Sequence, residues 1–190
     1  MQTEPIRNKK HIRAMTDYYL KQGKLRNYLL ILMGGYTGLR ISDLLCLTKA
    51  DVYDFTSHKF RTHIRIVERK TGKQKAIAIN KKVLAALYFF DFQDNNRDDF
   101  LFQSKRKKRA AIGRTQAWRI IKEAAVVVGI PGCISCHSLR KTLGYHSWKA
   151  GVSPVLLMDI FNHSSFVVTQ RYWGIAQDDR DKAYLNLILL

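Results

Sequence analysis

The sequence is poor in acidic residues. Asp and Glu number 15 against 33 Lys and Arg in 190 residues, which gives a formal net charge of +18. An excess of this size disfavours self-association and favours a polyanionic partner. DNA, RNA and an acidic membrane surface all meet that requirement, and a basic ribosomal or structural protein would carry such a charge as well.

Long apolar runs are also missing. No stretch approaches the ~18 consecutive apolar residues of a membrane-spanning helix, and residues 1–10 are polar, without the apolar segment of a signal peptide. The three cysteines, Cys46, Cys133 and Cys136, are too few and odd in number for a disulfide framework. We therefore expect an intracellular protein that acts in the cytoplasm and not at a membrane.

The length suits one domain, and the hydrophobic share of 46% is enough to build its core. Apolar periodicity predicts a first helical region over about 9–34, broken by Gly34, Gly35 and Gly38. It predicts further helices starting near Ser42 and over about 82–92, 115–128, 138–149, 153–161 and 179–190, with Ser164 or Ser165 capping one more. The chain should be mainly helical.

One part of the chain has the period-two alternation of strands instead. Residues 63–67 and 75–79 alternate, and the turn-like tetrad 70–73, Lys-Thr-Gly-Lys, lies between them. This pattern predicts a β-hairpin with a basic tip, to which residues 51–55 could add a third strand. The expected fold is a mixed α/β domain, mainly helical, with a small three-stranded antiparallel sheet.

Four short segments carry residues that suit phosphodiester exchange without a metal ion. They are Thr-Gly-Leu-Arg-Ile-Ser at 37–42, Arg-Lys-Thr-Gly-Lys at 69–73, His-Ser-Leu-Arg at 137–140, and 162–172, which contains Asn-His-Ser-Ser and Thr-Gln-Arg-Tyr. The chemistry needs guanidiniums that clamp the phosphate oxygens, a hydroxyl nucleophile and a general acid for the leaving oxygen. The segments offer Arg40 and Arg140 as clamps, Tyr172 as nucleophile, Lys70 as acid, and His137 and His163 as supporting groups.

In order and approximate spacing these segments resemble the tyrosine recombinase, or phage integrase, family, over about residues 29–190. The resemblance implies the catalytic-domain fold of that family. It also implies DNA cleavage through a 3′-phosphotyrosyl link at Tyr172, with no metal, ATP or other cofactor. The implied partner is double-stranded DNA, with four protomers acting on two sites; a monomer in the absence of DNA stays open. The apolar C-terminal segment 185–190 would pack on a neighbouring protomer or on its own domain.

The sequence departs from the family pattern in two places. Asn162 stands where the family usually has glycine, and only about 27 residues precede the matched region. We therefore expect one catalytic domain over residues 1–190, with a short N-terminal segment at 1–27 and no separate core-binding domain.

Basic residues outside the four segments are candidate DNA contacts, although a charged run is also typical of a solvated loop. These candidates are Lys73, Lys105, Arg106, Lys107, Lys108, Arg109, Arg114 and Lys141. The helix at 115–128 is a candidate for the major groove. Lys141 follows the second clamp arginine, where the family commonly has a basic residue or histidine.

Several assignments have competitors. Lys73 and Lys75 lie on the same hairpin as Lys70, and Tyr145 and Tyr184 are alternatives to Tyr172. Residues 133–137 match a c-type haem attachment pattern, but two partly buried thiols suit an intracellular chain better. At the level of function, a type IB topoisomerase and a non-catalytic DNA-binding protein remain alternatives. We expect a site-specific recombinase of a phage, mobile element or prokaryotic cell that acts in integration or excision.

Overall fold

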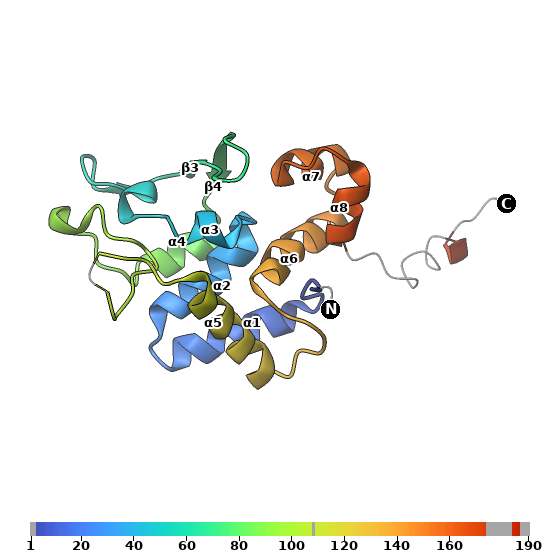
Figure 1. The fold of residues 1–190 in the computed structure, drawn as a ribbon, viewed down its shortest axis with the longest axis horizontal. Helices are drawn as coiled ribbons and strands as arrows, with labels where there is room; N and C mark the ends of the chain where they lie inside the picture. The colour runs from blue at the N-terminus through green and yellow to red at the C-terminus, as the bar shows by residue number, and fades with distance from the viewer. Residues whose placement is uncertain (1–2, 108, 174–183, 187–190) are drawn as a thin grey trace.

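A computed structural model describes residues 3–107, 109–173 and 184–186 of the chain (Figure 1). The helices are α1 Lys9–Lys21, α2 Leu25–Thr37, α3 Ile41–Leu44, α4 Lys81–Leu87, α5 Arg114–Val127, α6 Cys136–Lys149, α7 Pro154–Phe161 and α8 Phe166–Trp173, with 3₁₀ turns η1 Lys49–Asp51 and η2 Asp94–Asn96. The strands are β1 Tyr53–Asp54, β2 Lys59–Phe60, β3 His63–Val67 and β4 Gln74–Ala78. The expectation of a mainly helical chain is confirmed, and the described part has no helix long and apolar enough to cross a membrane.

The first helical region is confirmed, but it consists of two helices, α1 and α2. The chain turns between α1 and α2 at Gly23, whose φ is 64°. Gly34 does not break α2: a Cβ there would lie 2.6 Å from Cδ1 of Leu139, so glycine allows α2 and α6 to approach closely. The helix ends only at Thr37, where Gly38 adopts a left-handed conformation with φ 61°.

The predicted β-hairpin is confirmed, but the three-stranded sheet is not. Strands β3 and β4 pair antiparallel, with His63 opposite Ala78 and Val67 opposite Gln74. Residues 53–54 pair with 59–60 instead, in a separate two-stranded sheet. Residues 51–55 are followed so closely by a turn that they find a partner in the next few residues of the chain.

The apolar side chains form two clusters of unequal size. The main cluster joins α1, α2, α4, α5 and the start of α6, and α2 lies in its middle, with Leu29, Leu30 and Ile31 fully buried. The small cluster has Leu157 and Phe161 of α7 at its centre, with Leu143 and Tyr172 packed against them. Helix α6 links the two, because it contacts both α2 and α8. In Figure 1 the helices α7 and α8 stand beside the rest of the molecule on the far side of α6.

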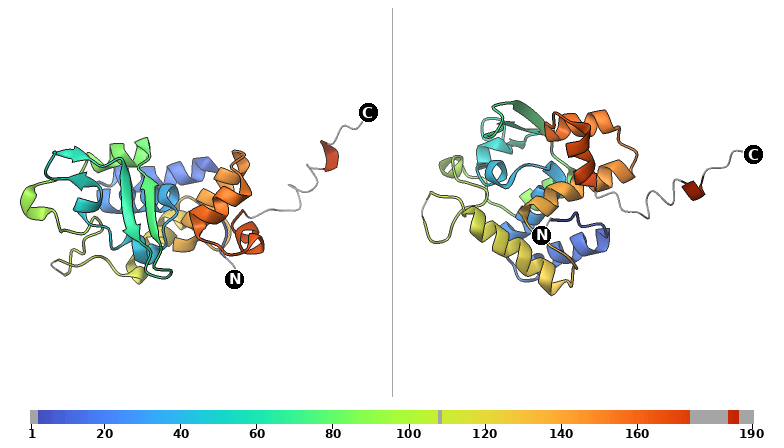
Figure 2. Two further views of the ribbon diagram at one scale, coloured as in Figure 1. Left: turned by 90° about the horizontal axis from the view of Figure 1, so that it is seen from above. Right: turned by 45° about the vertical axis from the view of Figure 1, so that its right-hand side comes forward.

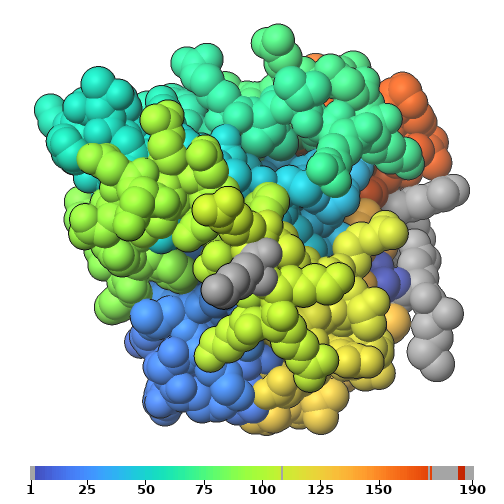
Figure 3. Space-filling view, turned by 60° about the vertical axis from the view of Figure 1, so that its left-hand side comes forward, coloured from blue at the N-terminus to red at the C-terminus, as the bar shows by residue number. Residues whose placement is uncertain are grey.

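Two features of the arrangement place the site. The β3–β4 hairpin lies beside α7 and α8 (Figure 2), where the Lys75 ammonium donates to the carbonyl of Ile160. On another face, the segment around residues 95–113 crosses between the β-hairpins and α1 (Figure 3). Most of the helix predicted at 179–190 lies outside the described residues.

Candidate active site

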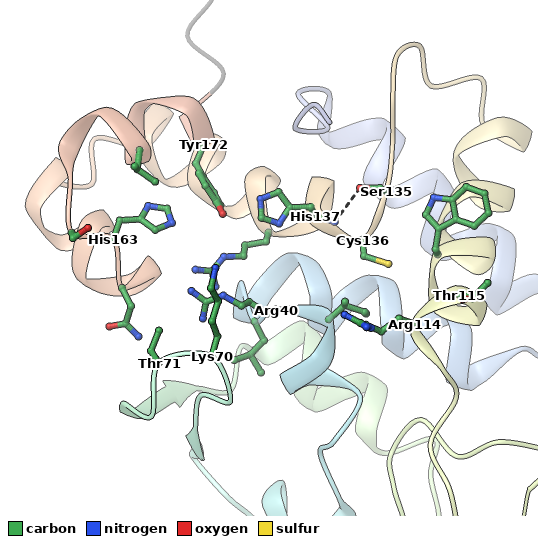
Figure 4. Close-up of a pocket in the computed structure, with 17 residues that line it drawn as sticks. Arg40, Lys70, Thr71, Arg114, Thr115, Ser135, Cys136, His137, His163 and Tyr172 are labelled. Carbon is green, nitrogen blue, oxygen red and sulfur yellow. Dashed lines mark hydrogen bonds between the residues drawn. The ribbon is translucent and has the colours of Figure 1, made fainter. Parts of the chain in front are cut away.

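The six residues that the sequence nominates for catalysis meet in one pocket. It has a volume of about 850 Å³ and is lined by residues of α6, α8, the β3–β4 turn, the start of α5 and the segment that follows α2 (Figure 4). Its lining includes Arg40, Lys70, His137, Arg140, His163 and Tyr172. Segments far apart in the sequence thus converge on one cavity that is open to solvent.

Arg140 is the most deeply buried of these residues, with 1% of its surface exposed. It lies one turn into α6, which Ser135 caps by accepting a hydrogen bond from the His137 amide at 3.2 Å. Nη2 of Arg140 donates to the Phe161 carbonyl at 2.7 Å, and Nη1 donates to the carbonyl of Gly38. Its guanidinium lies over the Phe161 ring, 4.8 Å from the centroid. The group is held from both sides before any ligand binds.

Arg40 is placed by the turn at Gly38 and by a buried carboxylate. Its Nη1 lies 2.9 Å from Oε2 of Glu68, whose side chain is fully buried, while 22% of the Arg40 side chain is exposed. The rest of the guanidinium can reach the pocket, because Arg40 is among the lining residues. The arginines carry their charge at any working pH, so the pocket has two fixed positive groups.

Tyr172 extends from α8 into the pocket between the two histidines (Figure 4). Its ring centroid lies 4.4 Å from that of His163 and 5.1 Å from that of His137. Gly144 of α6 allows this packing, because a Cβ at that position would lie 3.5 Å from Cβ of Tyr172 and 3.1 Å from Phe161. The ring of Tyr172 is therefore packed against both imidazoles.

His163 follows the end of α7, where Asn162 adopts a left-handed conformation with φ 50°. Its Nδ1 lies 3.0 Å from Oγ1 of the buried Thr169, and that hydroxyl donates to the Ser165 carbonyl at 3.3 Å. Because the hydroxyl hydrogen is used there, the network assigns the ring proton to Nδ1. The lone pair of the neutral ring is then on Nε2.

Both imidazoles are neutral at neutral pH. Desolvation in the pocket, followed by the positive charges of Lys141, Arg140 and Arg40, lowers the pKa of His137 to about 4. Desolvation, followed by the charges of Arg140 and Arg40, likewise lowers the pKa of His163 to about 4. A neutral imidazole can accept a proton or a hydrogen bond, so each ring can serve an attacking hydroxyl.

The structure separates the three lysines of the hairpin. Lys70 is exposed and lines the pocket, whereas Lys73 is exposed and is not among the lining residues. Lys75 is partly buried, with its Nζ 3.6 Å from Oε1 of Glu68. Burial lowers the pKa of Lys75 and the charge of Glu68 opposes that change. Lys70 alone has a free path to a ligand in this pocket.

The candidate DNA contacts differ in where they lie. Arg114 is exposed at the start of α5 and lines the pocket; Lys73, Lys105, Arg106, Lys107 and Arg109 are exposed elsewhere. Lys108 lies outside the described residues. Lys141 differs from the expectation: it is 5% exposed and donates to the Thr3 carbonyl at 2.7 Å. Its ammonium also lies 6.0 Å from the centroid of the Tyr172 ring, so a contact of Lys141 with DNA stays a prediction.

Sequence reasoning missed one residue of the site altogether. Glu68 is a buried carboxylate that contacts Arg40, Lys75, Thr71 and Asn162. An acidic residue at the end of a strand in a basic chain gives no signal of its own, because its partners lie in three separate segments. Asp43, also buried, accepts a hydrogen bond from the backbone amide of Arg69 at 3.2 Å.

The cysteines show no bond to one another. Cys46, Cys133 and Cys136 are free thiols of intermediate exposure. Cys136 lines the pocket, where burial raises the pKa of its thiol to about 11. Within the described ranges, no three or more His, Cys, Asp or Glu side chains are grouped as a metal site would require.

The known proteins that this chain resembles are integrases and recombinases. The phage integrase family matches residues 7–178. The probable integrase/recombinase YoeC of Bacillus subtilis is 36% identical, in an alignment that covers 95% of this chain and 94% of the YoeC chain. The crystal structure of XerA recombinase superposes with a TM-score of 0.73 at 21% identity, over 97% of this chain and 66% of that one. That of lambda integrase residues 75–356, bound to DNA, superposes with a TM-score of 0.67 at 14% identity, over 100% of this chain and 65% of the other.

Proposed function

The chain belongs to the phage integrase family of tyrosine recombinases, and we propose from this that it breaks and rejoins DNA strands at specific sites through Tyr172. The observation that carries the proposal is the convergence of two arginines, a lysine, two neutral histidines and a tyrosine on one open pocket. The net charge of +18 supports double-stranded DNA as the substrate.

In the cleavage step, Oη of Tyr172 attacks the scissile phosphorus. The phenolic proton passes to a neutral imidazole, for which Nε2 of His163 is suited by its tautomer. The bond between phosphorus and the oxygen of the 5′ carbon breaks. This leaves a 3′-phosphotyrosyl link on one strand end and a free 5′ oxygen on the other. Lys70, exposed on the hairpin turn, donates the proton that makes this oxygen a hydroxyl.

Charge on the non-bridging oxygens increases as the five-coordinate state forms. Arg40 and Arg140 are already oriented toward the pocket, so they stabilise that charge without reorganising. The reverse step, with a 5′-hydroxyl of another strand as the nucleophile, restores a phosphodiester and frees the tyrosine. Because each step exchanges one phosphoester for another, bond energy is conserved.

The finer parts of the proposal concern assembly and place. Exchange of strands between two DNA sites requires four protomers, as the family resemblance implies. The substrate would be chromosomal, phage or mobile-element DNA in the cytoplasm of a prokaryotic cell, in an integration or excision reaction. Since the chain spans about two thirds of the compared recombinase structures, 66% and 65% of their lengths, the activity of a whole recombinase is part of the proposal.

A suicide substrate tests the reaction. It is a duplex nicked near the cleavage site. Cleavage then releases a short fragment that carries the new 5′-hydroxyl, and because this fragment diffuses away the covalent complex accumulates. Candidate sites come from a footprint on the flanks of the parent element. Wild type should give an SDS-resistant adduct, and Tyr172→Phe should bind the duplex but give none. An adduct that persists in Tyr172→Phe and maps to Tyr184 would refute the assigned nucleophile.

The same preparation separates recombination from its nearest alternative. With supercoiled DNA that carries two sites, a recombinase gives junctions and exchanged products. Relaxation of supercoils without either product would make the protein a topoisomerase of the IB type.

A further inference from the structure

Glu68 is a fully buried carboxylate beside the pocket, and none of the steps above uses it. Burying an ionised carboxylate is unfavourable unless hydrogen bonds and opposite charges compensate it. Oε2 accepts hydrogen bonds from Asn162 Nδ2 at 2.7 Å and Thr71 Oγ1 at 2.9 Å, and Arg40 Nη1 forms an ion pair with it at 2.9 Å. The ammonium of Lys75 lies 3.6 Å from Oε1. The carboxylate is compensated by groups that are themselves near the site.

The ionised form of Glu68 is therefore favoured. Burial by itself would raise the pKa of this carboxyl, but hydrogen bonds from Asn162, Arg40 and Thr71, with the charge of Lys75, lower the pKa to about 2. Arg40, Arg140 and Lys75 repel one another, as their mutual effects on the pKa of Lys75 indicate. One negative charge among three positive ones offsets this repulsion while the pocket holds no phosphate.

The partners of Glu68 belong to three segments that carry three catalytic candidates. Arg40 follows α2, Thr71 is adjacent to Lys70 in the hairpin turn, and Asn162 immediately precedes His163. Glu68 also forms the turn, because its carbonyl accepts from the Gly72 amide at 2.8 Å. Figure 4 shows Lys70, which extends from the hairpin turn that also carries Thr71, beside Arg40. A single carboxylate thus links the groups that must act together.

The contact with Glu68 gives a reason why this chain has Asn162 where the family usually has glycine. Its φ of 50° is a conformation that glycine adopts freely and that asparagine tolerates better than most residues. Glycine would satisfy the backbone but would supply no side-chain donor. Asparagine satisfies both needs, because its amide reaches Glu68 from the end of α7.

We infer that Glu68 is a positioning residue for strand cleavage: through Arg40 and Asn162 it fixes the clamp guanidinium and joins the Lys70 turn to the segment that carries His163. The inference rests on the proposed function. Arg40 keeps donors for a phosphate, because the ion pair with Glu68 uses Nη1 and a guanidinium has five N–H groups. Glu68 therefore orients Arg40 without competing for all of it.

The test compares Glu68→Gln with Glu123→Gln. Each variant removes one negative charge, but Glu123 is a half-exposed residue of α5 that pairs with Lys24 at 4.0 Å. In single-turnover cleavage of the suicide substrate, Glu68→Gln should be about 10–100-fold slower, the size usual when a group that orients a ligating side chain is lost. The affinity of Glu68→Gln for DNA should stay within a few-fold of wild type. The cleavage rate of Glu123→Gln should also stay within a few-fold of wild type.

Two further variants separate positioning from folding. Asn162→Gly keeps the left-handed backbone and removes only the amide, so it should fold normally and cleave more slowly than wild type. In an Arg40→Lys background, Glu68→Gln should add little, because the group through which it acts is already lost. Unchanged cleavage by both Glu68→Gln and Asn162→Gly would overturn the inference, and so would faster cleavage, since Glu68 would then restrain Arg40.

A measurement without DNA keeps this inference separate from the proposed function. In the ¹⁵N spectrum of the free protein, the Arg40 Nε–H signal should report a rigid side chain in wild type and Glu123→Gln. The order parameter should fall in Glu68→Gln. If wild type forms no tyrosyl adduct, the proposed function fails while this spectrum still tests the role of Glu68. An Arg40 signal equally rigid in Glu68→Gln refutes that role.

Discussion

The main cluster and the small cluster hold their catalytic candidates in different ways. The main cluster is a continuous apolar core, and it supports the segments with Arg40 and Lys70 at its edge. The small cluster has two fully buried apolar residues, Leu157 and Phe161, yet Tyr172 packs on it and His163 directly follows α7. Polar contacts fasten the second to the first: Arg140 to Gly38, Lys75 to Ile160 and Asn162 to Glu68. Hydrogen bonds therefore fix the small cluster against the main one, whereas Tyr172 itself is placed by packing of its ring on Phe161 and His163.

The largest effect should come from removing a buried ring in each cluster. Phe102 and Phe161 are both fully buried, and Phe→Ala in a core typically costs about 3–5 kcal/mol. Phe102→Ala should lower the global melting temperature. Phe161→Ala should abolish cleavage while the main cluster stays folded, because only α7 and α8 lose their support.

Hydrogen exchange checks this pair. In Phe161→Ala the amides of α7 and α8 should exchange faster while those of α2 keep their protection. Equal loss of protection in α2 and α8 in both variants would mean that the clusters unfold as one unit.

The next effect sharpens the role of the main-cluster edge. Lys70→Ala should slow cleavage about 10²–10⁴-fold, the usual contribution of a general acid. A 5′-bridging phosphorothiolate needs no proton to leave, so this substrate should restore the rate of the variant. Lys73→Ala is the matched control, because Lys73 lies on the same turn but outside the pocket lining. Rescue of Lys73→Ala and not of Lys70→Ala would move the acid to Lys73.

The two clamp arginines should differ in stability but not in catalysis. Arg40→Lys and Arg140→Lys should each cleave about 10²–10³-fold more slowly, with little change in DNA affinity, because an ammonium lacks the bidentate fork. Arg140→Lys should also lower the melting temperature, since it loses contacts to the Gly38 and Phe161 carbonyls that join the clusters. Variants that both cleave within a few-fold of wild type would remove the arginines from the clamp.

The smallest effect is on the pH dependence of stability. His163 has a pKa of about 4 in the folded chain, against about 6.5 when unfolded. Between these values the unfolded chain binds more protons, so the free energy of unfolding should fall as the pH drops from 6.5 to 4. His163→Gln should flatten this slope, whereas His63→Gln, at an exposed strand position, should not. Denaturant titrations at several pH values measure it, and an unchanged slope in His163→Gln would contradict the assignment.

The parts of the fold that are encoded locally could be predicted from the sequence. The alternation at 63–67 and the Lys-Thr-Gly-Lys turn specify the hairpin, and Ser153 with Pro154 marks the start of α7. The predicted break at Gly34 was wrong because this glycine lies within α2 for reasons of packing, and the short turn at Gly23 was not predicted. The prediction of a third strand at 51–55 was wrong because pairing partners are decided by turns as well as by alternation.

The site followed the same division. Arg40, Lys70, His137, Arg140, His163 and Tyr172 could be nominated because each belongs to a short motif. Glu68 could not, because its role depends on distances to residues up to 94 positions away. The burial of Lys141 could not be predicted for a similar reason: its acceptor is the Thr3 carbonyl, 138 positions earlier in the chain.

The contact between Arg140 and Gly38 has a consequence for how this chain can evolve. The two residues are 102 positions apart, yet the carbonyl that Arg140 binds lies only two residues before Arg40. The distance between the two clamp arginines is therefore set by the short backbone segment from Gly38 to Arg40. It does not depend on the length of the chain between Arg40 and Arg140. Insertions at exposed positions between the two, such as residues 105–107, should be tolerated. Related proteins can therefore differ in sequence at these positions, and so in the DNA they contact, while the arrangement of the two clamp arginines is preserved.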